Sequence, residues 1–259
     1  MAGPSVPIDV HYQVDGRPGA PVVVLSHGLG MSMALWDPQI RRLSATFQVV
    51  RYDHRGHGQS PVPAGPYTIE DMGHDVIGLL DRLNVDRVSL CGLSLGGMMG
   101  IWLGANAPER IDRLVLCCTA ARMMRPEDYA TRAQQVREHG LASVADTVIG
   151  RWFTPAFVAR HSETITWVRA MLLATPAEGY AAACEAIAAM DQRGELPRIA
   201  ARTLVIAGAQ DQATPPEQAY EIARAIPGAE AVVIPDAAHL ANFEQAEPVT
   251  LQILRHLST

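Results

Sequence analysis

Runs of apolar residues recur along the first half of the chain, and most of them have the length of a buried strand. Residues 21–26, 47–52, 87–94 and 111–119 are rich in aliphatic and β-branched side chains, which is typical of strands covered on both faces. Amphipathic or apolar helical patterns separate these runs. Because strand and helix alternate, the pattern predicts an α/β fold with a mostly parallel central sheet and helices on both faces.

Flanking elements complete this first part of the predicted core. Residues 8–14 alternate between apolar and polar side chains, which predicts a half-exposed edge strand. Residues 35–43 form a short helical pattern. A longer amphipathic helix is expected to begin after Thr68 and to continue through Leu83, because Thr68 followed by acidic residues is typical of a capped helix start.

The hydrophobic pattern changes after the fourth buried run, where strand-like stretches disappear. Helical segments replace them, at residues 127–138, 142–149, 162–174 and 177–190. The sheet pattern then resumes, with strands expected at residues 203–208 and 231–234 and helices at residues 216–225 and 248–257. We therefore predict an α/β core in two parts, residues 1–119 and 198–259, separated by an inserted helical cap at residues 120–197.

Composition and charge limit the class of partner. The chain has 259 residues, of which 48% are hydrophobic, and a formal net charge of −6, without a Lys/Arg run that would suit nucleic acid. No apolar run is long enough to cross a membrane, and the first residues show no signal-peptide pattern. We expect a cytoplasmic protein with a small-molecule partner, no nucleic-acid or membrane partner, and a monomeric or small homo-oligomeric state.

The cysteines do not form a recognisable redox or metal motif. They lie at Cys91, Cys117, Cys118 and Cys184, without metal-ligand or C-x-x-C spacing. The first three fall in predicted core strands, where a cysteine behaves as a small hydrophobic residue. This usage indicates a reducing compartment and no disulfides.

The segment around Ser94 carries the clearest chemical signal. Gly92-Leu93-Ser94-Leu95-Gly96 ends a predicted strand, and an apolar helical pattern begins at once. A G-x-S-x-G sequence in this context predicts a nucleophile elbow, in which the serine lies on a strained turn and the two glycines make room for it. The alternative is a glycine-rich turn that serves packing alone.

A serine hydroxyl needs a base within hydrogen-bond reach and a third group that orients the base. Asp211 and His239 each follow directly after a predicted core strand, where loops meet the nucleophile. We predict Ser94 as the nucleophile, His239 as general base and then acid, and Asp211 as the group that orients the imidazole. Asp236 is the rival acid, but it lies on the same short loop as His239, which favours a turn residue.

Acyl transfer also requires hydrogen-bond donors for the negatively charged oxygen of the intermediate. The N–H of Leu95 is one candidate, because it begins a helix, where backbone donors are unpaired. The N–H of Leu29 is the second, in the segment His27-Gly28-Leu29-Gly30 after the strand at residues 21–26. We expect His27 to fix this loop rather than to act as an acid or base.

The histidine-rich segment at residues 53–58 (DHRGHG) is open to a second interpretation, a metal cluster. Because no carboxylate–histidine set at helical spacing occurs elsewhere, we favour a structural loop in which Arg55 pairs locally. We expect neither a metal nor an organic cofactor.

Together these motifs resemble the α/β-hydrolase superfamily over essentially the whole chain. They are His27-Gly28, Asp53-x-Arg55-Gly56-x-Gly58-x-Ser60, Gly92-x-Ser94-x-Gly96-Gly97 and the segment around His239. The order Ser94, Asp211, His239 is also the order of that superfamily. Within it, the chain is most similar to the 3-oxoadipate enol-lactonases, by residues 51–58 (RYDHRGHG), 91–98 (CGLSLGGM), 106–111 (NAPERI) and 151–155 (RWFTP).

This resemblance implies hydrolysis of 3-oxoadipate enol-lactone to 3-oxoadipate in the catabolism of aromatic compounds. A small lactone with a carboxylate arm needs a closed pocket and a cation, and the cap could supply both. Trp152 and Met123 or Met124 are candidate walls, and Arg122 is a candidate partner for the carboxylate. Cap aromatics and methionines are more often core residues, and cap arginines are more often solvated.

Three alternatives remain open at this stage. Relatives of the cofactor-free haloperoxidase and perhydrolase type share part of the same motifs, and in them peroxide would replace water as the acceptor. The second alternative is another small-ester carboxylesterase. The third is a non-catalytic member of the fold that binds a small ligand, which would have no need of a serine, histidine and aspartate set.

Overall fold

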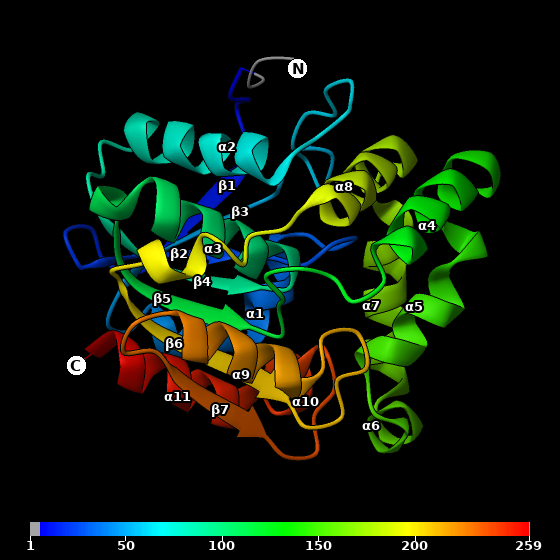
Figure 1. Ribbon diagram of the computed structural model, residues 1–259. Coiled ribbons are helices and arrows are strands. Elements are labelled where there is room, and N and C mark those ends of the chain that lie inside the picture. Colours follow the sequence, from blue (N-terminus) through cyan, green and yellow to red (C-terminus); the bar gives the residue numbers. More distant parts are fainter. Residues whose placement is uncertain (1–5, 259) are drawn as a thin grey trace.

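The computed structural model describes residues 6–258, and within them the strands form one seven-stranded sheet (Figure 1). The sheet order is β1-β3-β2-β4-β5-β6-β7, with β1 antiparallel to β3 and every other neighbour parallel. The strands are β1 (Tyr12–Asp15), β2 (Val22–Ser26), β3 (Gln48–Tyr52), β4 (Val88–Leu93), β5 (Ile111–Cys117), β6 (Arg202–Gly208) and β7 (Glu230–Ile234). The predicted α/β class with a mostly parallel sheet is confirmed.

Helices cover both faces of the sheet, which is why the inner strands are mostly apolar. On one face α3 packs on β4 and β5 with α2 beside it, and α9 packs on β6 and β7; on the other, α1 packs against β3 and α11 against β5. These helices are α1 (Asp37–Leu43), α2 (Ile69–Arg82), α3 (Leu95–Asn106), α9 (Pro216–Ala225) and α11 (Ala246–Ser258). The capped helix start predicted at Thr68 is confirmed as a capping box, since the Thr68 hydroxyl accepts from the Asp71 N–H and the Thr68 N–H donates to the Asp71 carboxylate.

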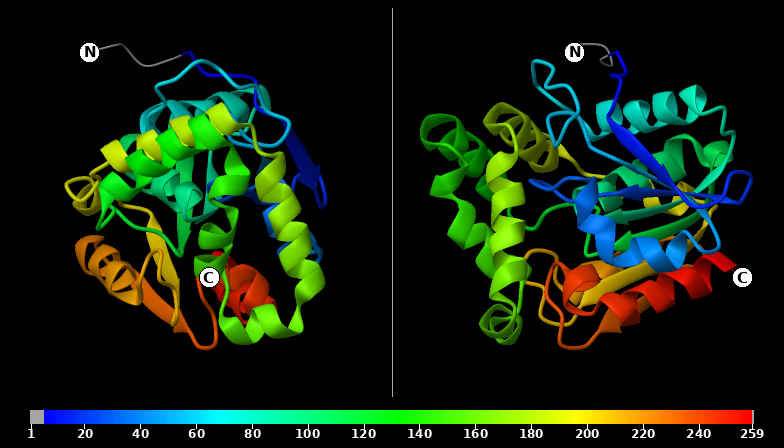
Figure 2. Two further views of the ribbon diagram at one scale, coloured as in Figure 1. Left: turned by 90° about the vertical axis from the view of Figure 1, so that its right-hand side faces the viewer. Right: turned by 180° about the vertical axis from the view of Figure 1, so that it is seen from behind.

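The helices between β5 and β6 gather beside the carboxyl ends of the strands (Figures 1 and 2). They are α4 (Pro126–His139), α5 (Ala145–Trp152), α6 (Pro155–Arg160), α7 (Ser162–Ala174) and α8 (Ala177–Ala189). Helix α4 packs along α8, and Arg137 of α4 forms ion pairs with Glu178 and Glu185 of α8. The exact limits of a cap domain at residues 120–197 stay a prediction. Helix α6 was not predicted, although Thr154 as N-cap and Pro155 as first residue mark its start.

Long-range hydrogen bonds explain where the first strand begins. The predicted edge strand at residues 8–14 is wrong at its start, because β1 begins at Tyr12. The N–H of Ile8 donates to Asp75 Oδ1 (2.8 Å), and the N–H of His11 donates to Ser60 Oγ (2.8 Å). Side chains from α2 and from the loop after β3 therefore take the donors that a longer strand would have used.

The described residues bear on the expectation of no membrane-spanning segment, but not on that of no signal peptide. None of the helices within residues 6–258 combines the length and the apolar character needed to span a bilayer. The N-terminal residues 1–5, on which the expectation of no signal peptide depends, lie outside the described residues.

Candidate active site

Ser94 lies on the turn between β4 and α3 in a strained backbone conformation, with φ 55° and ψ −114°. The end of β5 and the residues after it hold this turn from both sides. The N–H of Ser94 donates to the Cys117 carbonyl (2.9 Å), and the hydroxyl of Thr119 donates to the Ser94 carbonyl (2.7 Å). Strain of this kind persists only where the surroundings enforce it, and it presents the serine side chain at the carboxyl edge of the sheet.

The glycines on either side of Ser94 are required by close backbone approach. A Cβ on Gly92 would lie 2.2 Å from the Gly96 carbonyl oxygen, and a Cβ on Gly96 would lie 2.3 Å from the Ser26 carbonyl oxygen. Neither distance is compatible with a side chain, because both neighbours are backbone atoms that cannot rotate away. This confirms the steric reason for the G-x-S-x-G spacing.

Asp211 and His239, which follow β6 and β7, are buried and joined by a hydrogen bond. His239 Nδ1–H donates to Asp211 Oδ2 at 2.8 Å. The carboxylate is held in turn by Thr214, whose hydroxyl donates to Oδ2 (2.8 Å) and whose N–H donates to Oδ1 (3.0 Å). With its proton on Nδ1, the neutral imidazole keeps a lone pair on Nε2, which is the atom that a general base needs.

The charge of Asp211 follows from these contacts. Burial alone would raise the pKa of the carboxyl, but the facing His239 and the hydrogen bonds from His239 and Thr214 outweigh it, so the pKa is lowered. The group is therefore ionised at neutral pH. Because its pKa is depressed on folding, the carboxylate stabilises the folded state above its unfolded pKa, and this contribution is lost as the pH falls through the folded pKa.

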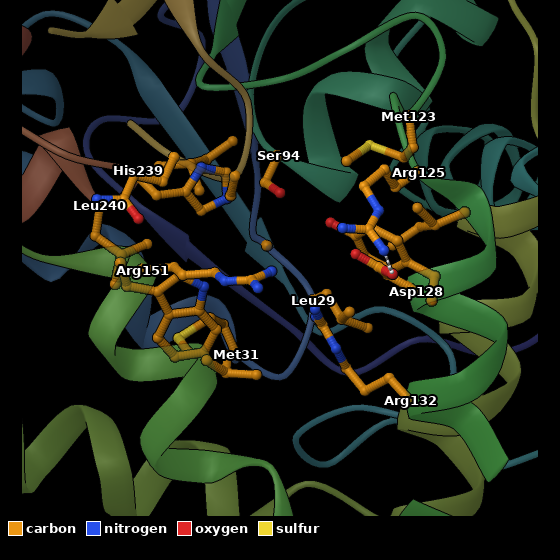
Figure 3. A pocket seen from close by; sticks show the side chains of 18 of the residues that line it. Leu29, Met31, Ser94, Met123, Arg125, Asp128, Arg132, Arg151, His239 and Leu240 are labelled. Atoms are coloured by element: carbon orange, nitrogen blue, oxygen red, sulfur yellow. Dashed lines mark ion pairs between the residues drawn. The ribbon is translucent and has the colours of Figure 1, made fainter. Parts of the chain in front are cut away.

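Ser94 and His239 line one cavity of about 250 Å³ between the sheet edge and the cap (Figure 3). The structure thus brings the predicted nucleophile and the predicted base to a common space, whereas Asp211, which accepts a hydrogen bond from His239, is not among the lining residues. Core residues from the loop after β2 form one side, and cap side chains form the opposite side. Its apolar lining includes Leu29, Met31, Leu93, Met123, Met124, Val148, Trp152, Ile187 and Leu240.

The loop after β2 is held so that the Leu29 N–H is free to face a ligand. His27 Nδ1–H donates to the Gly28 carbonyl (2.8 Å), and Gly30 N–H donates to His57 Nε2 (3.1 Å). The Gly28 carbonyl and the Leu29 N–H belong to one trans peptide and point in opposite directions, so fixing the first fixes the second. Among residues 6–258, neither Leu29 nor Leu95 donates its N–H to another backbone group. Both predicted oxyanion donors are thus available, and their role stays a prediction.

The buried histidines around this loop are neutral. His54 N–H donates to His27 Nε2 (3.1 Å), which leaves the proton of His27 on Nδ1. Burial lowers the pKa of His27, and burial together with the nearby His27 lowers the pKa of His57 to about 3. Within the described part of the chain, no cluster of histidine, cysteine and carboxylate side chains is arranged to hold a metal ion. Arg55, which was expected to pair locally, forms an ion pair with Asp75 of α2 (2.6 Å).

The cap contributes positive charge to the cavity. Arg125, Arg132 and Arg151 line it (Figure 3). Arg125 is paired with Asp128, which lies 3.0 Å away, whereas Arg132 and Arg151 have no carboxylate partner among residues 6–258. The hydroxyl of the fully buried Tyr180 lies on the same wall and faces Arg132. The cavity therefore combines a nucleophile with unneutralised cations.

The candidate substrate-binding residues divide into two groups. Trp152 and Met123 line the cavity, as does Met124. Arg122 does not: its side chain is half exposed, and its Nε lies 3.9 Å from Asp191 Oδ2. The prediction of Arg122 as the carboxylate partner is therefore wrong, because Arg122 lies outside the cavity. Arg125 and Arg132 line the cavity instead.

Comparisons with known proteins agree with this geometry. A family model described as alpha/beta hydrolase fold matches residues 21–246. The chain is 38% identical over 240 residues to 3-oxoadipate enol-lactonase 2 of Acinetobacter baylyi, covering 93% of this chain and 90% of that protein. It is similar to the solved enol-lactonase from Burkholderia xenovorans LB400, with a TM-score of 0.95, 44% identity and 96% of both chains covered. A malate-bound esterase from Thermogutta terrifontis matches with a TM-score of 0.91 and 35% identity, over 97% of this chain and 93% of that one.

Proposed function

This chain belongs to the α/β-hydrolase family and is an ester-hydrolysing enzyme, and on that basis we propose that it opens a small enol-lactone that carries a carboxylate. The reaction is 3-oxoadipate enol-lactone plus water to 3-oxoadipate, a step of aromatic-compound catabolism. The observation that carries the proposal is the cavity itself. It has Ser94 and His239 on the sheet side and unpaired arginines on the cap side.

In the first half of the reaction, Ser94 Oγ attacks the lactone carbonyl while His239 Nε2 accepts the hydroxyl proton. The carboxylate of Asp211 stabilises the imidazolium that forms. The N–H groups of Leu29 and Leu95 donate to the oxyanion. When the intermediate collapses, the ring C–O bond breaks, His239 returns the proton to the enol oxygen, and the enol becomes a ketone. The opened chain stays attached as an ester of Ser94.

In the second half, His239 removes a proton from water, which attacks the acyl-enzyme carbonyl. The bond between the carbonyl carbon and Ser94 Oγ then breaks, and His239 gives the proton back to the serine. One water is consumed, and no cofactor enters the balance. The product leaves with a carboxylate at each end, so a positively charged cavity is matched to both substrate and product.

The positive cap wall supports the choice of an anionic substrate. Arg132 and Arg151 are well suited to a carboxylate, since the planar guanidinium binds it through paired, charge-assisted hydrogen bonds. The related Thermogutta esterase was solved with malate, a dicarboxylate, bound to it. A neutral ester would leave these guanidinium groups without a counter-charge inside the cavity.

Arg132→Gln is expected to lower kcat/KM for the carboxylate-bearing enol-lactone by about 10- to 100-fold, the value of one charge-assisted hydrogen bond. For a neutral aryl ester we expect a change of less than about threefold, because no carboxylate is present to be bound. The matched control is Arg122→Gln, outside the cavity, which should change neither rate. Equal losses on both substrates would contradict a carboxylate-binding role.

The substrate itself is tested by turnover on a matched series: the enol-lactone, a saturated lactone of equal size, and p-nitrophenyl acetate. We expect the highest kcat/KM for the enol-lactone, because its enol is the best leaving group among the ring-opening substrates and its carboxylate has partners. A p-nitrophenyl acetate kcat/KM tenfold above that of the enol-lactone would overturn the proposal. Faster peracid formation than hydrolysis, measured with acetate and peroxide, would support a perhydrolase instead.

A further inference from the structure

Glu244 joins the loop that carries His239 to the cap. It is the last residue of α10 (Ala241–Glu244) and is half-buried. Its Oε1 accepts from the Thr154 N–H (2.7 Å) and from the Thr154 hydroxyl (2.8 Å). Its Oε2 accepts from the N–H of Ala238, the residue directly before His239. One carboxylate thus binds a cap segment with one oxygen and the histidine loop with the other.

A second contact reinforces the same junction. The N–H of Leu240 donates to the carbonyl of Trp152 at 2.9 Å. The residues on both sides of His239 are therefore held by the junction, one by Glu244 and the other by the cap backbone. The Trp152 side chain and the His239 ring both line the cavity, so the junction sets one cap wall and the base relative to each other.

We propose that Glu244 is a positioning residue that couples docking of the cap segment 152–154 to the placement of His239. This inference rests on the proposed catalytic role of His239, but not on the identity of the lactone. A carboxylate can hold the two segments together firmly, because hydrogen bonds to a charged acceptor are shorter and stronger than those to a neutral one. Displacing the catalytic base by about 1 Å is enough to cost on the order of 100-fold in rate.

The hydrogen bonds to Glu244 predict which substitution will affect its contact with the cap and which its contact with the histidine loop. Three donors face two carboxylate oxygens. In Glu244→Gln, one oxygen becomes an NH₂ group, which cannot accept, so either the Ala238 N–H or the Thr154 donors lose their partner. Thr154→Val removes the hydroxyl that donates to Glu244 and that caps α6 by accepting from the Phe157 N–H, and it leaves the Ala238 side of the bridge intact.

The test measures two reactions with each variant. One is turnover of p-nitrophenyl acetate, and the other is the rate at which a small fluorophosphonate labels Ser94, which needs the base but not a substrate carboxylate. For Glu244→Gln we expect kcat and the labelling rate to fall together by about 10- to 100-fold. For Thr154→Val we expect a higher KM for p-nitrophenyl acetate and a labelling rate within about threefold of wild type.

The control is Glu247→Gln, an exposed glutamate that pairs with Arg42 and should change neither reaction. A Glu244→Gln variant that folds, as judged by its melting temperature, but labels at the wild-type rate would overturn the coupling, even if KM rises. If Glu244→Gln does not fold, Glu244→Asp takes its place, since it keeps the charge but shortens the reach; a wild-type labelling rate there would equally overturn it. Failure of the lactone proposal would leave these aryl-ester and labelling results unaffected.

Discussion

Replacing Ser94 with alanine is expected to lower kcat on the enol-lactone by about 10⁶-fold, the loss measured when a serine nucleophile that works with a histidine is removed. The substitution takes away the hydroxyl that forms the acyl-enzyme and leaves the oxyanion donors and the cap in place. The backbone strain at φ 55° is unchanged, because alanine and serine have the same Cβ. The check is steady-state turnover, together with mass spectrometry after fluorophosphonate treatment, where we expect no adduct.

The matched control is Ser89→Ala, a buried serine on the same strand β4 that does not line the cavity. It should keep turnover close to wild type and accept the label at Ser94. An alanine variant at position 94 that retains kcat within tenfold of wild type would reject nucleophilic catalysis by this serine. If the wild-type protein bound the lactone without turning it over, the non-catalytic alternative would be supported instead.

The strands could be predicted because a strand that is buried on both faces appears in the sequence as a run of apolar residues. The inner strands β2 to β6 belong to a sheet with helices on both faces, so most of their residues are buried and apolar and the runs stand out. The edge strand β1 lacks that cover. Its true start depends on Asp75 and Ser60, which are far away in the sequence, so alternation of apolar and polar residues placed it too early.

The polar residues at the carboxyl edge of the sheet could also be predicted from the sequence, because the topology of a parallel sheet places them there. Parallel strands end at a common edge, so polar residues directly after core strands are brought close together whatever the details of packing. Asp211 and His239 form a hydrogen bond by this route although 28 positions separate them. Thr214 was missed, although a threonine three residues after an aspartate is a recognisable turn signal.

The cap side of the cavity could not be predicted in the same way. Which face of α4 turns inward depends on its contact with α8, where Ala133 and Val136 are buried. That packing leaves the adjacent Arg132 at the cavity, whereas Arg122 precedes the helix and pairs with Asp191. The hydrophobic pattern of α4 is weak because only Ala133 and Val136 are buried in it, so the sequence offered no basis for choosing between arginines.

Asp211→Asn is the second substitution with a large expected effect, a fall in kcat of about 10⁴-fold. The shape of the side chain is kept, but an amide NH₂ facing Nδ1 favours the imidazole tautomer that has its proton on Nε2. His239 would then have no lone pair directed at the Ser94 hydroxyl, and the negative charge that stabilises the imidazolium would be gone. Steady-state kcat and the rate of fluorophosphonate labelling should fall together, while the enol-lactone KM changes little.

Asp236→Asn is the control for this change. Asp236 lies on the same loop as His239, is exposed, and has φ 52°, a conformation that asparagine also tolerates. The two variants therefore remove the same charge and add the same amide at positions three and twenty-eight residues from the histidine. If Asp236→Asn were the more damaging of the two, the orienting acid would be Asp236. If neither lowered kcat by more than about tenfold, His239 would work without a carboxylate partner, and the 2.8 Å hydrogen bond that it donates to Asp211 would be structural.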